Sequence, residues 1–268
     1  MIKNNILNRV KLPYKEVRGS FEARQNKAAQ FTHGVMNKIS GQLDDRGVSL
    51  SKFSRELKKV LPKNLDFFVQ KNKDKESYAQ LCNIYSKDNV IIKQSLEIRP
   101  NEQGKINILH IPTISHEIRH LADSLYHPKI LSREQSITKK GLDTDKFMAF
   151  YNDNIYVKEM EGGKKLQRDI IKSIRHDTEK VLKGHTAGDK IDMLQYIRYN
   201  LISERNAFRE GAKTGKILYK KHKPVYEDEI FDQTKEYMFN EKIKLFHDMI
   251  AEIIKKERGI HSSKLKKK

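Results

Sequence analysis

The sequence predicts an α+β fold, in which a small antiparallel or mixed sheet is followed by a predominantly helical C-terminal half. Between residues 65 and 111 the apolar segments are short, rich in β-branched and aromatic residues, and separated by turn-forming stretches, which is typical of strands. From residue 164 onward, apolar residues recur instead at intervals of three and four, which is typical of amphipathic helices. The 268 residues are enough to enclose a hydrophobic core.

The N-terminal half is expected to contain helices, then strands, then one more helix. Apolar spacing predicts helices at 21–43 and 50–61, and either Ser49 or Ser51 can cap the second. Strands are expected at 65–70, 78–85, 89–98 and 105–111. Because proline interrupts a strand, we expect the last strand to end at Pro112 and Thr113 to cap a helix that runs to Tyr126.

The C-terminal half is expected to be almost entirely helical. The predicted helices are a short one near 145–151 and longer ones at 164–184, 189–214 and 227–257. Breaks between the long helices are expected at Gly184–His185, Gly215 and Lys223–Pro224. The predicted organisation is a flexible segment at 1–20, a single domain at 21–257 with halves 21–128 and 129–257, and a disordered basic tail at 258–268.

The composition is strongly basic and contains almost no cysteine. Lys and Arg number 54 against 35 Asp and Glu, which gives a net charge of +19 and favours acidic partners. A lysine-rich solvated surface is the simpler interpretation of the same numbers. No apolar stretch is long enough to span a membrane, no Sec-type signal peptide is recognisable, and Cys82 is the only cysteine. We therefore expect a protein of a reducing compartment, or one exported without a Sec signal.

The residues that carry the chemistry are His116, Glu117 and His120, in the segment His-Glu-Ile-Arg-His. Positions i and i+4 of a helix lie on one face, so both imidazoles can bind one zinc ion per chain. Glu117 lies about 100° round the helix, beside the ion, where it can act as general base on a zinc-bound water. A separate stripe of apolar residues at helical spacing is expected to face the core, formed by Ile114, Ile118, Leu121 and Leu125.

A strand that leads into a helix with the pattern H-E-x-x-H resembles the zincin superfamily of metallopeptidases. The resemblance covers about residues 105–127. It implies a sheet above the active helix, an edge strand that pairs with an extended substrate, and a third zinc ligand farther along the chain. The longer metzincin pattern is absent, because Asp123 stands at its glycine position and Tyr126 at its last histidine position.

Glu204 is the preferred third ligand. It shares one helix face with small residues, at spacings of four, three and four in the series Asn200, Glu204, Ala207 and Gly211. Small residues allow two helices to approach closely, which a ligand that reaches histidines on another helix requires. Glu204-x-x-Ala207 resembles the glutamate helix of gluzincins, although the N-E-x-x-S-D form is absent. Asp123 is predicted to accept the ring N–H of His120.

Several other residues remain open as site residues. Rival third ligands are Asp143, Asp145 and Glu210, and the segment around Asp145 has a loose similarity to the aspartate segment of aspzincins. An electrophile that stabilises the oxyanion of the reaction can come from Tyr199, Arg209, Tyr219 or His222, and the sequence does not choose among them.

The sequence thus predicts a zinc-dependent metalloendopeptidase that acts on a protein or peptide substrate. Its size and its single H-E-x-x-H helix are similar to those of bacterial effector and toxin zinc proteases. The main alternative is a basic protein that binds nucleic acid or an acidic surface and in which the H-E-x-x-H helix is not catalytic. A helical interaction protein built on 164–257 is a third interpretation.

Overall fold

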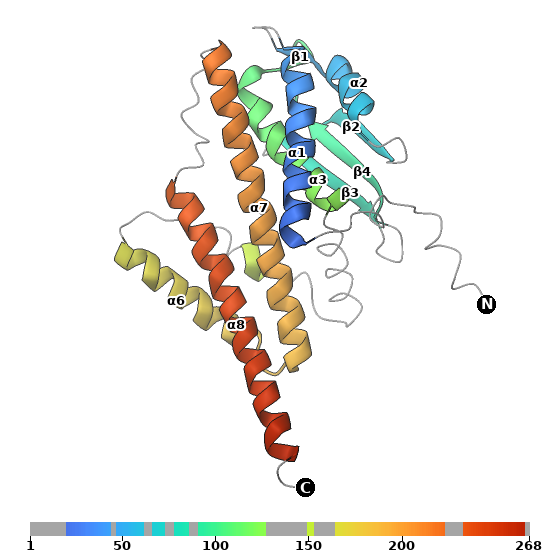
Figure 1. Cartoon of the computed structure of the whole chain (residues 1–268). Coiled ribbons are helices and arrows are strands. Elements are labelled where there is room, and N and C mark those ends of the chain that lie inside the picture. Colours follow the sequence, from blue (N-terminus) through green and yellow to red (C-terminus); the bar gives the residue numbers. More distant parts are fainter. Residues whose placement is uncertain are drawn as a thin grey trace, which may run out of the picture. The chain divides into compact units, whose positions relative to one another are not determined.

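The computed structural model describes residues 20–43, 47–61, 66–72, 78–85, 91–126, 149–152, 164–222 and 233–265 (Figure 1). Most of the segment 1–20, predicted to be flexible, lies outside these residues. The chain divides into two compact units, of which the first comprises Met1–Pro128 and Asn206–Ile230 and the second comprises Lys129–Arg205 and Phe231–Lys268. Helix α7 (Ala187–His222) is continuous and contributes residues to both units.

Two helices open the first unit, as the apolar spacing predicts. Helix α1 (Phe21–Ser40) begins where Ser20 accepts a hydrogen bond from the backbone N–H of Ala23. Helix α2 (Leu50–Val60) is capped in the same way by Ser49, whose hydroxyl oxygen accepts the N–H of Lys52 at 3.3 Å. Of the two serines that the sequence offers for this cap, the structure therefore selects Ser49.

The sheet of the first unit is mixed. Strands β2 (Phe67–Lys71), β3 (Ala79–Tyr85) and β4 (Ile91–Ile98) lie in the order β2-β4-β3, with β2 parallel and β3 antiparallel to the central β4. A separate antiparallel pair is formed by β1 (Val48–Ser49) and β5 (Lys105–Ile106). Gly47, beside this pair, has φ +84°, and a Cβ there would lie 2.1 Å from the carbonyl oxygen of Ile106, so only glycine fits.

The strand predicted at 105–111 is wrong for most of its length. Only Lys105–Ile106 form a strand, and a 3-10 turn over Ile108–His110 leads directly into helix α3 (Ile111–Tyr126). The turn forms because the side chain of Asn107 accepts the N–H of Leu109 at 3.0 Å. Thr113 does not cap α3, because the helix already includes Pro112, which the first turn of a helix tolerates.

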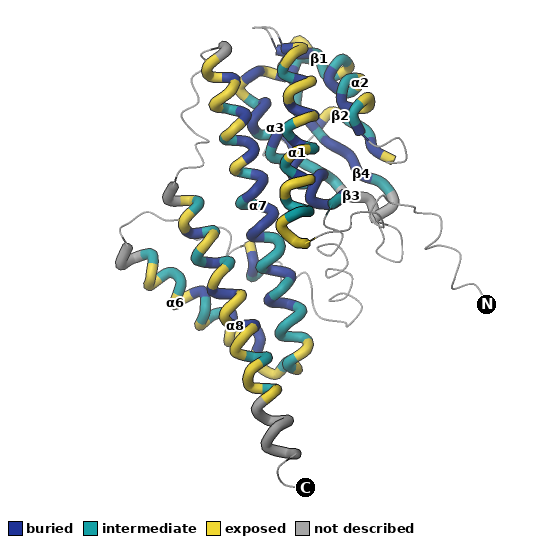
Figure 2. Tube along the Cα trace, viewed as in Figure 1, coloured by how far each residue is buried: buried dark blue, intermediate teal, exposed yellow. Residues whose placement is uncertain are grey.

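Helix α3 supplies the centre of the first unit's core. The predicted apolar stripe of Ile114, Ile118, Leu121 and Leu125 is at most 1% exposed and packs with residues of α1, α2 and the sheet. Figure 2 shows the corresponding buried track along α3 and along the central strand β4. The H-E-x-x-H helix is thus a core element rather than a surface helix.

The second unit is helical in its described residues. Helix α6 (Lys164–Val181), the N-terminal part of α7 and helix α8 (Gln233–Leu265) share a second core that includes Ile174, Leu194, Ile197 and Phe246.

The break predicted at Gly184 is confirmed, since this glycine has φ +88°. The break predicted at Gly215 is wrong, because α7 continues to His222. Helix α8 extends to Leu265, past the end predicted at residue 257.

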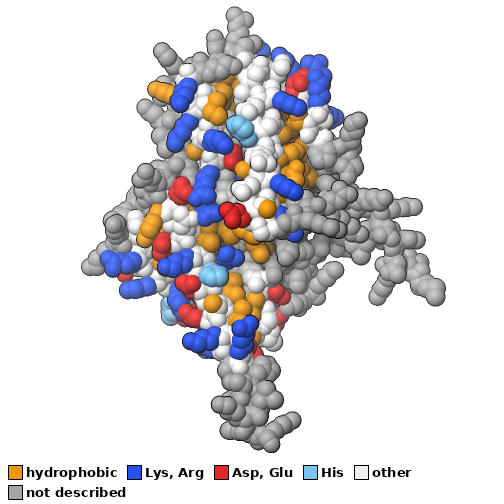
Figure 3. All heavy atoms as spheres, viewed as in Figure 1, with side chains coloured by type: hydrophobic (Ala, Val, Ile, Leu, Met, Phe, Trp, Pro, Cys, Tyr) orange, Lys and Arg blue, Asp and Glu red, His pale blue; other side chains and the backbone are white. Residues whose placement is uncertain are grey.

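The short helix predicted near 145–151 falls partly outside the described residues, of which 149–152 are helical. No described helix is long and apolar enough to cross a membrane. The face in Figure 3 carries basic and acidic side chains interspersed with groups of apolar ones.

Candidate metal centre

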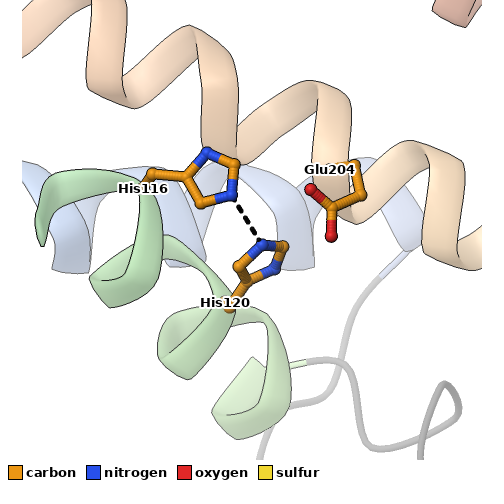
Figure 4. A group of neighbouring side chains, drawn as sticks. All are labelled: His116, His120 and Glu204. Carbon is orange, nitrogen blue, oxygen red and sulfur yellow. Dashed lines mark hydrogen bonds between the residues drawn. The ribbon is translucent and has the colours of Figure 1, made fainter. Parts of the chain in front are cut away.

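The two histidines of α3 direct their rings toward the same point. Their Nε2 atoms lie 3.0 Å apart, and one of them donates a hydrogen bond to the other. The ring centroids of His116 and His120 are 4.7 Å apart, with planes at 75°. Figure 4 shows both rings on the side of α3 next to α7, with the carboxylate of Glu204 beside them.

Glu204 completes a group of three donors, as its helix face predicts. One nitrogen from each ring and one carboxylate oxygen all lie within 4.8 Å of one another, and all three residues are half-buried. A tetrahedral zinc with bond lengths of about 2.0–2.1 Å requires ligand atoms about 3.3 Å apart. The two nitrogens are near this separation, and the carboxylate oxygen lies within 4.8 Å of both. Two imidazoles and a carboxylate therefore fit zinc.

Close packing of the α7 segment from Asn206 onward against α3 fixes where Glu204 lies. A Cβ on Gly211 would be 3.0 Å from the carbonyl oxygen of Pro112 and 3.8 Å from the Cβ of His116. The hydroxyls of Ser115 and Thr214 hydrogen-bond at 2.8 Å across the same contact. Phe208, one turn beyond Glu204, packs edge-on against the ring of His116, with centroids 4.6 Å apart. The predicted role of the small residues in close helix approach is confirmed at Gly211.

Arg119, a buried residue of α3 next to His120 in the chain, contacts side chains of α1, α3 and α7. Arg119 donates from Nε to the carboxylate of Asp123 at 3.0 Å, and its Nη1 lies 3.9 Å from the carboxylate of Glu210 on α7. Its Nη2 donates to the side-chain oxygen of Gln25 on α1, which also accepts a hydrogen bond from the side-chain amide of Asn206. Arg119 and Asp123 are 3% and 2% exposed, so their charges compensate each other inside the protein.

Glu117 contacts the sheet. Its Oε2 accepts a hydrogen bond of 2.8 Å from the backbone N–H of Leu81 on β3. The N–H of Arg99 donates to the carbonyl of Tyr78, so these two residues form a hydrogen-bonded pair of the antiparallel ladder between β3 and β4. Hydrogen-bonded and non-hydrogen-bonded pairs alternate along such a ladder, and Leu81 belongs to a non-hydrogen-bonded pair. Its backbone N–H and C=O therefore point away from β4. Glu117 therefore lies at the outer edge of β3, where no other described strand pairs.

The structure excludes some of the other residues predicted as third ligands or electrophiles and leaves others open. Glu210 faces Arg119 and is not in the three-donor group, while Asp143 and Asp145 lie outside the described residues. Tyr219 and His222 are about 22 and 27 Å beyond Glu204 along the same helix, so neither can be the electrophile. Tyr199 and Arg209 lie closer along α7 and stay open. The role predicted for Asp123, acceptance of the His120 ring N–H, remains a prediction.

No family model, curated protein or solved structure matches this chain. The assignment of the centre therefore rests on the residues themselves.

Proposed function

We propose that the chain is a zinc-dependent metalloendopeptidase that hydrolyses peptide bonds of a protein substrate. The observation that carries this proposal is the convergence of His116, His120 and Glu204 on one point, with Glu117 next to the first histidine on the same helix. Two histidines and a glutamate are a protein ligand set of catalytic zinc in peptidases, which leaves a position for water or substrate.

The neighbouring carboxylate favours hydrolysis over oxidation. Two histidines and one carboxylate also suit iron(II) in oxygenases. A hydrolytic site needs in addition a base that is not a ligand, and Glu117 supplies a carboxylate beside the histidines that is not in the three-donor group. This additional acid–base group supports zinc hydrolysis as the chemistry of the site.

The roles of the residues follow from their positions. His116, His120 and Glu204 would hold the ion, which when bound lowers the pKa of a coordinated water towards about 7 and polarises a carbonyl. The Glu117 carboxylate would take the proton of the attacking water and return it to the leaving amine. The N–H of Leu81 binds Oε2 of this carboxylate, which orients the carboxylate relative to α3 and leaves Oε1 for proton transfer.

We expect an extended substrate to bind along the outer edge of β3. The backbone groups of Ala79, Leu81 and Asn83 point away from β4, as the alternation of hydrogen-bonded pairs requires. An added peptide strand can pair with such an edge through the backbone groups of Ala79 and Asn83 and the carbonyl of Leu81, since the Leu81 N–H is bound to Glu117. Because Leu81 contacts Glu117, a peptide paired there would place a backbone carbonyl near the proposed base.

A cleavage experiment tests the proposal. Purified full-length protein is incubated with an unfolded protein mixture, and new N-termini are identified by mass spectrometry. We expect products from the wild type that disappear with a zinc chelator, return with added Zn²⁺, and are absent from Glu117→Gln and from His116→Ala/His120→Ala. Products that are the same for all three proteins, or no cleavage by a wild type that contains stoichiometric zinc, would rule the proposal out.

A further inference from the structure

Three exposed lysines line the outer face of α7 in the first unit. Lys213, Lys216 and Lys220 are separated by three and four residues, so they lie within about 60° of one another around the helix and along about 10 Å of its axis. Figure 3 shows basic side chains with apolar neighbours over the upper part of α7. We call these lysines, together with Ile217 and Tyr219, the lysine face.

The lysine face gathers three cations on one side of a helix, and none of them has an acidic partner among the described residues, whereas some cations on other helices are paired. On α6, Arg175 pairs with Glu179 at 3.0 Å and with Glu252 at 2.7 Å, and on α2, Lys59 pairs with Glu56 at 2.9 Å. On α7 beyond Arg205 the acidic residue is Glu210, which is buried toward Arg119. Among the described residues, none of the three lysines forms an ion pair.

Helix stability does not account for this arrangement. Like charges three and four residues apart destabilise a helix. The helix dipole favours cations only in the last turn, which includes Lys220 but not Lys213 or Lys216. Their repulsion is relieved when an acidic group binds.

The apolar members of the lysine face indicate the kind of partner. Ile217 and Tyr219 are 43% and 56% exposed and flank the lysines on either side. A nucleic-acid backbone gives no apolar contact to Ile217, and membrane binding needs a broader apolar face than two residues provide. A protein segment that carries both carboxylates and apolar side chains complements both features, and tyrosine is enriched in such interfaces.

We propose that the lysine face of α7 docks an acidic segment of a protein partner, with an apolar side chain of the partner against Tyr219 or Ile217. If the proposed function holds, this partner is the protein substrate. The lysine face would then bind one segment of the substrate at a distance from the metal centre, where another segment is cleaved. The binding itself does not depend on catalysis.

The test measures binding of a fluorescent helical peptide with glutamates at three- and four-residue spacing and leucines beside them. The protein is full-length Glu117→Gln, so that cleavage does not consume the peptide. The face variant is Lys213→Glu/Lys216→Glu/Lys220→Glu. The control, with the same change of net charge, is Lys183→Glu/Lys255→Glu/Lys256→Glu, which replaces exposed lysines elsewhere. Circular dichroism checks folding, and three Lys→Gln changes replace the face variant if the Glu changes unfold it.

We expect the face variant to bind the peptide about tenfold more weakly and the control to change by less than about twofold. We expect binding to weaken with salt and to be lost when glutamine replaces the peptide's glutamates. Equal losses in both variants would overturn the proposal, since net charge alone would then explain binding. An unaffected face variant would also overturn it, as would polyuridylate RNA or phosphatidylserine vesicles binding the lysine face more tightly than the peptide. Failure of catalysis with intact peptide binding would reject the proposed function alone.

Discussion

The backbone N–H of Leu81 donates a hydrogen bond of 2.8 Å to Oε2 of Glu117 and thereby joins the outer edge of the sheet to the helix that bears both histidines. The two residues are 36 positions apart in the chain. The same contact determines where the proposed base lies and which strand edge is next to it.

Changing Glu117 to glutamine tests its role as a base without removing this contact, since an amide oxygen can also accept the N–H of Leu81. We expect zinc content and stability to stay unchanged and peptide hydrolysis to fall by about 10²–10⁴-fold, the usual contribution of a general base. Glu117→Ala should lose the same activity and also about 1–3 kcal/mol of stability, because the Leu81 N–H loses its partner. Hydrolysis by Glu117→Gln at the wild-type rate would rule out Glu117 as the base.

The two glycines of α7 that contact Pro112 should respond differently to alanine. At Gly211 the new Cβ meets a backbone carbonyl at 3.0 Å, which cannot rotate away, so α7 must shift from α3. We expect Gly211→Ala to cost about 1–3 kcal/mol in urea unfolding and to weaken zinc binding. At Gly215 the nearest atom is 3.5 Å away, so alanine fits and its helix propensity adds up to about 1 kcal/mol. Equal effects at both positions would contradict the close helix approach.

Arg119 should be among the most sensitive positions of the first unit. Arg119→Met leaves the buried carboxylate of Asp123 without its cation, and breaking a buried pair in this way costs about 3–5 kcal/mol. Arg175, which pairs with Glu252 at the surface, is the matched control, and Arg175→Met should cost less than about 1 kcal/mol. Urea unfolding measures both changes. Similar small losses would show that the network around Arg119 does not stabilise the helices.

The only cysteine provides a chemical probe of β3. Burial raises the pKa of the Cys82 thiol, and the charge of Glu97 raises this pKa further. Cys82 therefore carries less thiolate at pH 8 than an ordinary cysteine, and iodoacetamide should modify it slowly. Glu97→Gln removes a negative charge, so the pKa should fall and the rate at pH 8 should rise. An unchanged rate would mean that the charge of Glu97 does not reach the thiol.

The sequence predicted the parts of the site that depend on spacing within one helix. His116 and His120 converge because they are one turn apart, and Glu204 was found because small residues share its face. Leu81 could not be found, because its contact depends on which edge of β3 faces Glu117. The buried ion pair of Asp123 with Arg119 was not predicted either, since Asp123 was assigned to the ring of His120.

The fold predictions failed where local spacing competes with side-chain or tertiary contacts. Asn107 starts a 3-10 turn inside a segment whose apolar pattern predicts a strand. Gly215 predicts a helix break, but it lies within the continuous helix α7, next to Pro112 of α3. The parallel pairing of β2 with β4 joins segments that are distant in the chain, so a short sequence pattern cannot predict it.

Metal content tests the central claim most directly. Full-length protein purified without chelators, loaded with Zn²⁺ and desalted is measured by inductively coupled plasma mass spectrometry, together with His116→Ala/His120→Ala, Glu204→Ala and Glu210→Gln. We expect about one zinc per chain in the wild type and in Glu210→Gln, and none in the double histidine variant. In Glu204→Ala we expect the affinity for zinc to fall by more than about 100-fold, which exceeds the loss expected when a residue that only supports a ligand is removed. Equal zinc in all four proteins, or none in the wild type, would contradict the metal centre.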